Sequence, residues 1–130
     1  MSDAQALLPE HGRANGMVIE RVDETGARIT LDYERDRHGG APGLFHGGQI
    51  GALLEAAMSA AVNAGAASTN AARTVSLTVQ YLRAAGRARL FAEARIVRRG
   101  RQLAYVEARA FQDDPEKPVA MATANYAFGS

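Results

Sequence analysis

One helix-forming segment most constrains the fold of this chain. Apolar residues recur at intervals of three and four between Ile50 and Val62, which is the period of an α-helix. Glu55 is the only charged residue of this segment. The side opposite the apolar stripe, where a surface helix carries Lys and Glu, holds alanine at positions 52, 56 and 60. We therefore expect one helix over 47–63 that is covered on most of its sides.

The rest of the chain shows the period of two that is typical of β-strands. Two such runs, 17–22 and 27–33, flank a turn sequence and predict a hairpin. Four more strand-like runs follow the helix, at 74–82, 87–97, 102–112 and 117–128. The links between these four runs are short, so we expect each run to pair with the next one in antiparallel orientation.

Alanine supplies most of one face in the last three of these strands. Small side chains let a sheet curve closely around a cylinder, and the helix at 47–63 is the only cylinder that the sequence offers. We therefore predict an α+β fold in which an antiparallel sheet wraps around one long central helix. Residues 1–130 then form a single domain, with 1–16 as a loose or partly helical lead-in and with loops at 34–45 and 66–73.

Composition excludes several classes of function. The 15 Lys and Arg against 14 Asp and Glu give a net charge of +1, which provides no basic surface for nucleic acid. No run approaches the roughly 20 apolar residues of a membrane-spanning helix, and the first sixteen residues lack the apolar region of a secretory signal. The chain has no cysteine, and its 3 histidines are too scattered for a metal site. We expect a cytoplasmic protein without a metal.

The stretch that begins at His46 carries the chemistry. Gly47 and Gly48 open the helix, and free N–H groups at a helix start form a site for an anion or oxyanion. At 100° per residue, Gly48, Gly51 and Glu55 fall along one flank of the helix. A carboxylate near such amides suits a base or nucleophile acting at a carbonyl carbon. The residues alone leave open a simpler interpretation, in which Glu55 is solvated and the glycines aid packing.

This stretch resembles the motif of the hotdog-fold acyl-CoA thioesterases of the PaaI-like, phenylacetate-pathway type. The motif is His46-Gly47-Gly48, followed by the acid nine residues after the histidine. The run Thr74-Val-Ser-Leu-Thr-Val-Gln-Tyr-Leu-Arg83 and the hairpin Arg98-Arg-Gly-Arg101 are also similar to that family, so the resemblance spans roughly 17–128. It implies the hotdog fold and an acyl-CoA substrate, with coenzyme A as part of the substrate and no cofactor besides. It also implies a homodimer or homotetramer (a dimer of dimers) with active sites shared between subunits.

The resemblance also implies a role for individual residues. Glu55 matches the family acid, which activates water or attacks the thioester directly. Gly47 matches the glycine whose N–H polarises the thioester carbonyl, and Thr74 matches a Ser or Thr that helps to hold the water. His46 matches the motif histidine, which we interpret as a positioning residue. Further contacts with the substrate are expected from Gly48, Arg98, Gly100 and Arg101. For the arginines, the alternative is an ordinary solvated hairpin.

One position departs from the family pattern. Many members carry Asn or Gln six residues before the motif histidine, where this chain has Gly40. His38 lies close by as a replacement, although a histidine in such a loop is expected to be exposed. The sequence thus predicts a thioesterase that hydrolyses an acyl- or aryl-CoA, with a non-catalytic acyl-CoA-binding module as the alternative. A hotdog hydratase or dehydratase ranks last, because His38 is its only candidate catalytic histidine and the spacing of His38 to Glu55 does not fit that class.

The face of the sheet that points away from the helix is expected to be partly apolar. The side chains on it are those of Phe91, Leu103, Tyr105 and Phe111. Exposed apolar patches of this kind usually mark an interface. The sequence therefore predicts self-association through this face.

Overall fold

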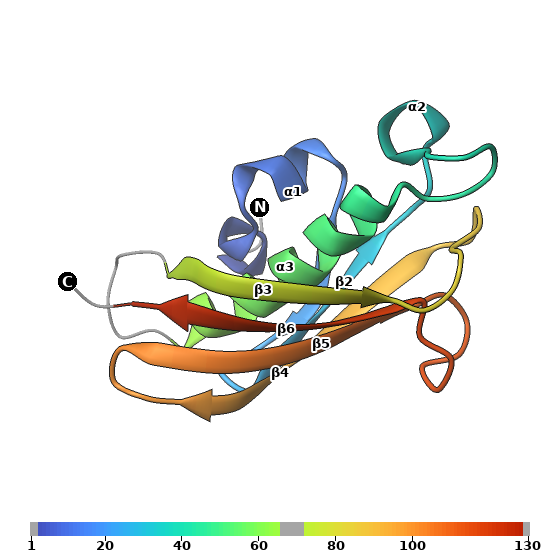
Figure 1. Ribbon diagram of the computed structural model, residues 1–130. Coiled ribbons are helices and arrows are strands. Elements are labelled where there is room, and N and C mark those ends of the chain that lie inside the picture. Colours follow the sequence, from blue (N-terminus) through green and yellow to red (C-terminus); the bar gives the residue numbers. More distant parts are fainter. Residues whose placement is uncertain (1–2, 66–71, 129–130) are drawn as a thin grey trace.

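The computed structural model describes residues 3–65 and 72–128. Within these residues, six strands form one antiparallel sheet that curves around a single long helix (Figure 1). The elements in chain order are η1 (Asp3–Leu7), α1 (Glu10–Ala14), β1 (Val18–Val22), β2 (Gly26–Leu31), α2 (Arg35–His38), α3 (Gly47–Ala64), β3 (Arg73–Tyr81), β4 (Leu90–Arg99), β5 (Leu103–Phe111) and β6 (Ala120–Ala127). The predicted α+β fold, a sheet around one long central helix, is confirmed.

Helix α3 begins where the sequence predicts, and most of its surface is buried. Ala56 and Ala60, on the side opposite the apolar stripe, are as fully buried as Leu53 and Leu54. They are covered because the helix packs against β2, β4, β5 and β6. Burial of this second side explains why the helix carries alanine there and not the Lys and Glu of a surface helix.

The alanine faces of β4, β5 and β6 lie against α3, as predicted. The residues on these faces are Ala92, Ala94, Ala104, Ala108, Ala110, Ala120, Ala122 and Ala124, and all are buried. Successive side chains of a strand point to opposite faces of its sheet. The small inward side chains therefore bring the sheet backbone close to the helix along its whole length.

The order of the strands corrects one expectation. The hairpin β1–β2 and the pairs β4–β5 and β5–β6 are as predicted, but β3 pairs with β6 and not with β4. The reason is that β4 begins at Leu90 rather than at residue 87, which lengthens the link from β3 to residues 82–89. Such a link can reach about 26 Å when extended. That exceeds the roughly 14 Å between strands three places apart, so the link crosses the end of the sheet.

The two edges of the sheet differ in how they are protected. At the β1 edge, the side chain of Gln5 hydrogen-bonds to both the N–H (3.1 Å) and the carbonyl oxygen (2.9 Å) of Ile19, and a bulge follows. At the other edge, no strand within the described residues pairs with the outer side of β3. Val75, Leu77 and Tyr81 are exposed there. An apolar edge strand without protection is a template for another strand, so among the described residues the β3 edge is the more open of the two to a second chain.

The outer face of the sheet is less apolar than predicted. Leu103 and Tyr105 are exposed there, but Phe111 is buried. The ring of Phe111 stacks on that of Phe91, with 5.4 Å between centroids, and the guanidinium group of Arg28 lies over both rings. A cation over two stacked rings shields them from water. The expectation of an apolar outer patch that includes Phe111 is therefore wrong.

The segment before β1 contributes to the core. Leu8 and Met17, at the two ends of α1, are buried, and both η1 and α1 contact α3. The predicted loop at 34–45 contains the short helix α2, and a bridge between Gly39 and Phe45 closes the rest of it. The loop predicted at 66–73 lies, for its greater part, outside the described residues. The single domain over 1–130 stays a prediction.

Candidate active site

His46 forms the cap of α3 at the start of the helix. Its backbone is extended (φ −66°, ψ 135°), and its Nδ1 accepts a 2.9 Å hydrogen bond from the N–H of Gly48. Ser, Thr, Asp and Asn usually fill this position because a side-chain acceptor satisfies an N–H of the first turn. Here the imidazole Nδ1 of His46 supplies that acceptor. This geometry agrees with a positioning role for His46.

The N–H groups of Gly47 and Gly48, both expected to be free at the helix start, differ in whether they have a hydrogen-bond acceptor. The N–H of Gly48 is used by His46, so the expectation that it is free is wrong. The N–H of Gly47 has no acceptor among the described residues. Because the N-terminus of a helix carries partial positive charge, this N–H can bind an oxyanion. The helix start therefore offers one donor and not two.

Glu55 lies two turns further along α3 and is half-buried. One of its carboxylate oxygens, Oε2, accepts a 2.8 Å hydrogen bond from the hydroxyl of Thr74 on β3. No side chain within the described residues donates to the other oxygen, Oε1. A carboxylate oxygen without a partner next to a hydroxyl is an arrangement that can bind a water molecule and remove its proton.

Tyr126 supports this pair from the core side. Its side chain is 1% exposed, and its hydroxyl donates a 3.2 Å hydrogen bond to the backbone carbonyl oxygen of Glu55. Burial raises the pKa of Tyr126, a hydrogen bond with Thr74 acts in the opposite direction, and the charge of Glu55 raises the pKa further. Sequence analysis missed Tyr126, although it continues the inward-facing alternation of β6 after Ala124.

Tyr81, at the end of β3, lies over the first turn of α3. Its hydroxyl donates a 2.7 Å hydrogen bond to the carbonyl oxygen of Gly47. A Cβ at Gly47 would lie 3.4 Å from the tyrosine ring, and a Cβ at Gly51 would lie 3.2 Å from its hydroxyl oxygen. The sequence placed Tyr81 within the motif that resembles the family but gave it no role.

Gly40 has a physical reason to be glycine. A Cβ at this position would lie 2.9 Å from the Cα of His46, which is closer than a side chain can approach a backbone atom. The loop is held in this place by a 2.7 Å hydrogen bond from the N–H of His46 to the carbonyl oxygen of His38. The side chain of the Asn or Gln found here in many family members therefore has no room in this loop conformation.

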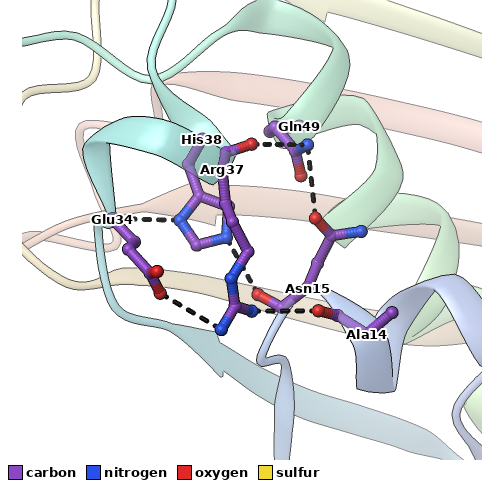
Figure 2. A network of polar contacts seen from close by, with 6 residues as sticks. All are labelled: Ala14, Asn15, Glu34, Arg37, His38 and Gln49. Carbon is purple, nitrogen blue, oxygen red and sulfur yellow. Dashed lines mark hydrogen bonds and ion pairs between the residues drawn. The ribbon is translucent and has the colours of Figure 1, made fainter.

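His38 is buried and not exposed as expected, with 1% of its surface accessible. Its Nδ1 accepts a 2.9 Å hydrogen bond from the N–H of Glu34, and its Nε2 lies 2.8 Å from the carbonyl oxygen of Asn15. Figure 2 shows this network, in which Arg37 and Gln49 also contact residues of the N-terminal segment. Both ring nitrogens of His38 are therefore engaged in structural hydrogen bonds. Neither is free to replace the missing amide or to act as a hydratase base.

The arginine-rich hairpin between β4 and β5 lies at the other end of α3. Arg99 points inward, and its guanidinium group donates to the carbonyl oxygens of Val62 (3.2 Å) and Ala61 (3.3 Å) in the last turn of the helix. The helix rises about 22 Å from Gly47 to Val62. A shallow pocket of about 360 Å³ at the hairpin is lined by Arg98, Gly100, Arg101, Gln102 and Leu103. Within one chain, the structure therefore does not bring these predicted binding residues to the helix start.

No group of three or more His, Asp or Glu side chains within the described residues could hold a metal ion. No helix among residues 3–65 and 72–128 is both long and apolar enough to cross a membrane. A site without metal or other cofactor stays a prediction.

Comparison with known proteins identifies the family. The sequence model of the acyl-CoA thioesterase N-terminal domain matches residues 25–127. The chain belongs to this thioesterase family. Membership supports acyl-CoA thioester hydrolysis as the general activity, with acyl-CoA as the class of substrate. No curated protein matches the sequence.

Solved structures of other proteins share the fold over nearly the whole chain. A phenylacetic acid degradation-related protein from Ralstonia eutropha is 28% identical, with a TM-score of 0.83 over 93% of this chain and 91% of its own. A variant of the phenylacetic acid degradation protein PaaI from Thermus thermophilus is 25% identical, with a TM-score of 0.79 over 92% and 98%. A conserved protein from Pseudomonas aeruginosa, 21% identical, shares the fold with a TM-score of 0.86 over 97% and 98%. The predicted resemblance to PaaI-like hotdog thioesterases is confirmed.

Proposed function

We propose that this protein hydrolyses an acyl- or aryl-CoA thioester to the free acid and CoA, with Glu55 as the general base or nucleophile. The observation that carries the proposal is the 2.8 Å hydrogen bond from Thr74 to Glu55 on the flank of α3. The first N–H of this helix, that of Gly47, has no acceptor among the described residues. Glu55 and Thr74 hold the attacking water. The N–H of Gly47 polarises the thioester carbonyl and stabilises the oxyanion.

Glu55 and Gly47 lie too far apart in one chain to act on the same carbonyl group. They are eight positions apart in the sequence, which corresponds to about 12 Å along the helix axis. A reacting atom must lie about 3 Å from both the nucleophile and the oxyanion donor. We therefore assign Glu55 of one protomer and Gly47 of a second protomer to each site, in agreement with the shared active sites of the family. The open β3 edge, which carries Thr74, is the side on which the second protomer binds.

The reaction follows from these positions. As a base, Glu55 removes a proton from the water, and the resulting hydroxide attacks the carbonyl carbon to give a tetrahedral oxyanion at the N–H of Gly47. The oxyanion collapses, the C–S bond breaks, and the CoA thiolate takes the proton from Glu55. As a nucleophile, Glu55 attacks the carbonyl carbon itself and the C–S bond breaks, which releases the thiolate and leaves an anhydride. Water then hydrolyses the anhydride to the free acid and Glu55, and the proton released in this step passes to the thiolate.

The rest of the substrate is assigned to residues that the family resemblance implies. Arg98 and Arg101, on either side of Gly100, suit the phosphate groups of coenzyme A. Gly48 lines the start of the helix without a side chain that would obstruct the thioester. The proposal includes a homodimer or a dimer of dimers in the cytoplasm, and it requires no metal or redox cofactor.

The test is the release of free thiol from phenylacetyl-, benzoyl-, hexanoyl- and palmitoyl-CoA by the wild type and by Glu55→Gln. We expect turnover in the wild type and a loss of about 10²–10⁴-fold in the variant, because the amide cannot accept a proton from water. Glu107→Gln, on the outer face of β5, is the matched control and keeps the wild-type rate. A wild-type rate in Glu55→Gln would refute the assignment.

A second candidate function is a non-catalytic acyl-CoA-binding module. The observation in its favour is Gly40, since the loop leaves no space for the amide that many family members carry there. Calorimetry distinguishes the two functions. Saturable binding of an acyl-CoA without thiol release by the wild type would favour the binding module.

A further inference from the structure

Two side chains hold the peptide group between Gly47 and Gly48 at both of its ends. Its carbonyl oxygen accepts the 2.7 Å hydrogen bond from the hydroxyl of Tyr81. Its N–H donates the 2.9 Å hydrogen bond to Nδ1 of His46. Tyr81 comes from the end of β3 and His46 from the loop before α3, so the two restraints are independent. Together they fix the plane of this peptide group.

This restraint acts on a residue that otherwise has unusual freedom. Gly47 has no side chain to limit its backbone angles, and the first residue of a helix lacks an intrahelical acceptor for its N–H. The peptide group between His46 and Gly47 is also held in place. Its oxygen, the carbonyl oxygen of His46, accepts hydrogen bonds from the N–H groups of Gln49 (2.9 Å) and Ile50 (3.3 Å). Gly47 thus lies between two fixed peptide groups, and the second of them is fixed by Tyr81 and His46. The free N–H of Gly47 belongs to the first of these peptide groups, and the second one joins it to the rest of the first turn of α3.

The position of Tyr81 also accounts for Gly51. Glycine inside a helix costs about 1 kcal/mol relative to alanine. A Cβ at Gly51 would meet, outside the helix itself, only the hydroxyl oxygen of Tyr81 among the described residues, at 3.2 Å. Among the described residues, an alanine at position 51 would therefore displace only the hydroxyl of Tyr81.

Packing into the core does not explain this contact. Within a single protomer the side chain of Tyr81 remains 54% exposed, on an edge strand that buries little of its surface. We propose that Tyr81 is a positioning residue of the thioesterase site, whose hydroxyl anchors the first turn of α3, the turn from which the Gly47 N–H donates to the thioester carbonyl. This inference rests on the proposed function, and it assigns Tyr81 no contact with the reacting atoms.

The first test compares Tyr81→Phe with the wild type in the thiol-release assay, using the acyl-CoA with the highest turnover. We expect kcat to fall about tenfold, because one hydrogen bond to the donor segment is lost. KM should stay within about twofold, since the ring remains and ground-state binding does not change. The melting temperature should also stay the same. Tyr105→Phe, which removes the hydroxyl of an exposed tyrosine on the outer face, is the matched control and keeps the wild-type kcat.

The second test is a double-mutant cycle with Gly51→Ala. In the wild-type background, the new Cβ displaces the hydroxyl of Tyr81, so kcat falls even though alanine favours the helix. In the Tyr81→Phe background there is no hydroxyl to displace, so Gly51→Ala causes no further loss. The amide signals of Gly47 and Gly48 in ¹⁵N–¹H spectra report the same change without substrate, and we expect them to shift in Tyr81→Phe.

The possible results separate this inference from the proposed function. An active wild type whose kcat is unaffected by Tyr81→Phe, or a Gly51→Ala loss of equal size in both backgrounds, overturns the role of Tyr81 and leaves that of Glu55 intact. Unshifted amide signals also overturn it, because the hydroxyl then does not hold the peptide group. A wild type that hydrolyses none of the acyl-CoAs overturns the proposed function, and the role of Tyr81 in that reaction with it.

Discussion

The hydroxyl of Thr74 on the edge strand β3 donates a 2.8 Å hydrogen bond to Oε2 of Glu55 on the central helix α3. The two residues are 19 positions apart, and neither lies at a turn that would bring them together locally. They meet because β3 pairs with β6, where Thr74 lies opposite Tyr126, whose hydroxyl in turn contacts the backbone of Glu55. The position of β3 in the sheet therefore builds half of the candidate site.

Removal of the Thr74 hydroxyl should slow hydrolysis without unfolding the protein. Thr74→Val keeps the shape of the side chain, and we expect kcat to fall about tenfold because Glu55 loses the donor that orients its carboxylate and the water. Thr74→Ser retains the hydroxyl and should keep most of the activity. Thiol release measures both variants, and equal rates in the two would contradict a role for the hydroxyl.

Features that depend on local periodicity could be predicted from the sequence. The helix and the alanine faces follow from the spacing of apolar and small residues, and the structure places them as expected. The partner of β3 could not be predicted, because it depends on where the following link ends. That link runs to Leu90, and no pattern in the sequence marks this residue as the start of β4 rather than residue 87.

Residues of the candidate site that belong to the sequence motif could be predicted, but residues that reach the site through long-range contacts could not. His46, Gly47, Glu55 and Thr74 follow from the resemblance. The hydroxyl of Tyr81, by contrast, reaches an oxygen 34 positions away, by a contact that the fold determines. The same applies to His38, which is buried because the carbonyl oxygen of Asn15, 23 positions away, binds its ring. Sequence spacing contains no information on such contacts.

Tyr126 should make stability depend on alkaline pH. Burial raises its pKa above the value of about 10 in an unfolded chain. The stability that comes from the protonated phenol is therefore fully present below pH 10 and is lost as the pH rises toward the folded-state pKa, because the unfolded chain releases the proton first. Tyr126→Phe should lower the free energy of unfolding by about 1 kcal/mol at pH 7, through loss of the hydrogen bond to Glu55.

Urea denaturation at pH values from 7 to 11 measures this effect. The wild type should lose more stability than Tyr126→Phe above pH 10, so the difference between the two proteins shrinks there. The exposed-tyrosine variant Tyr105→Phe is the control and should follow the wild type. A constant difference between the wild type and Tyr126→Phe over the whole range would show that the raised pKa does not contribute.

The neighbouring arginines of the β4–β5 hairpin should have separable effects. Arg99→Ala removes the donors to the last turn of α3 and should lower the free energy of unfolding by about 1–2 kcal/mol. Arg98→Ala should leave stability unchanged and raise KM severalfold, more so at low salt, because Arg98 is assigned to the phosphate groups of coenzyme A. Thermal melts and steady-state kinetics at two salt concentrations measure the two effects. An unchanged KM in Arg98→Ala would remove it from the substrate site.

The open edge of the sheet should be the one that associates. Leu77→Lys puts a charge on exposed β3, and Val18→Lys puts the same charge on β1, whose edge Gln5 already blocks. Charged side chains on an edge strand oppose pairing with another chain. Light scattering at micromolar concentration should show a monomer for Leu77→Lys and the wild-type oligomer for Val18→Lys. A monomeric wild type, or an intact oligomer in Leu77→Lys, would contradict this assignment.

Mixing two inactive variants should restore activity if each site takes Glu55 from one protomer and Gly47 from another. Glu55→Gln removes the base, and Gly47→Pro removes the N–H at the first helical position, where proline is tolerated. Each variant alone has two defective sites per dimer. In a mixed dimer, one site receives both defects and the other receives the intact Glu55 and the intact Gly47.

The mixed dimers should therefore hydrolyse acyl-CoA, although neither parent does. Unfolding and refolding an equal mixture gives half of the dimers in mixed form, each with one intact site, so we expect about one quarter of the wild-type rate per protomer. A mixture of two preparations of Glu55→Gln, treated in the same way, is the control. If each site used Glu55 and Gly47 of the same chain, every site in the mixture would contain one defect and no activity would return.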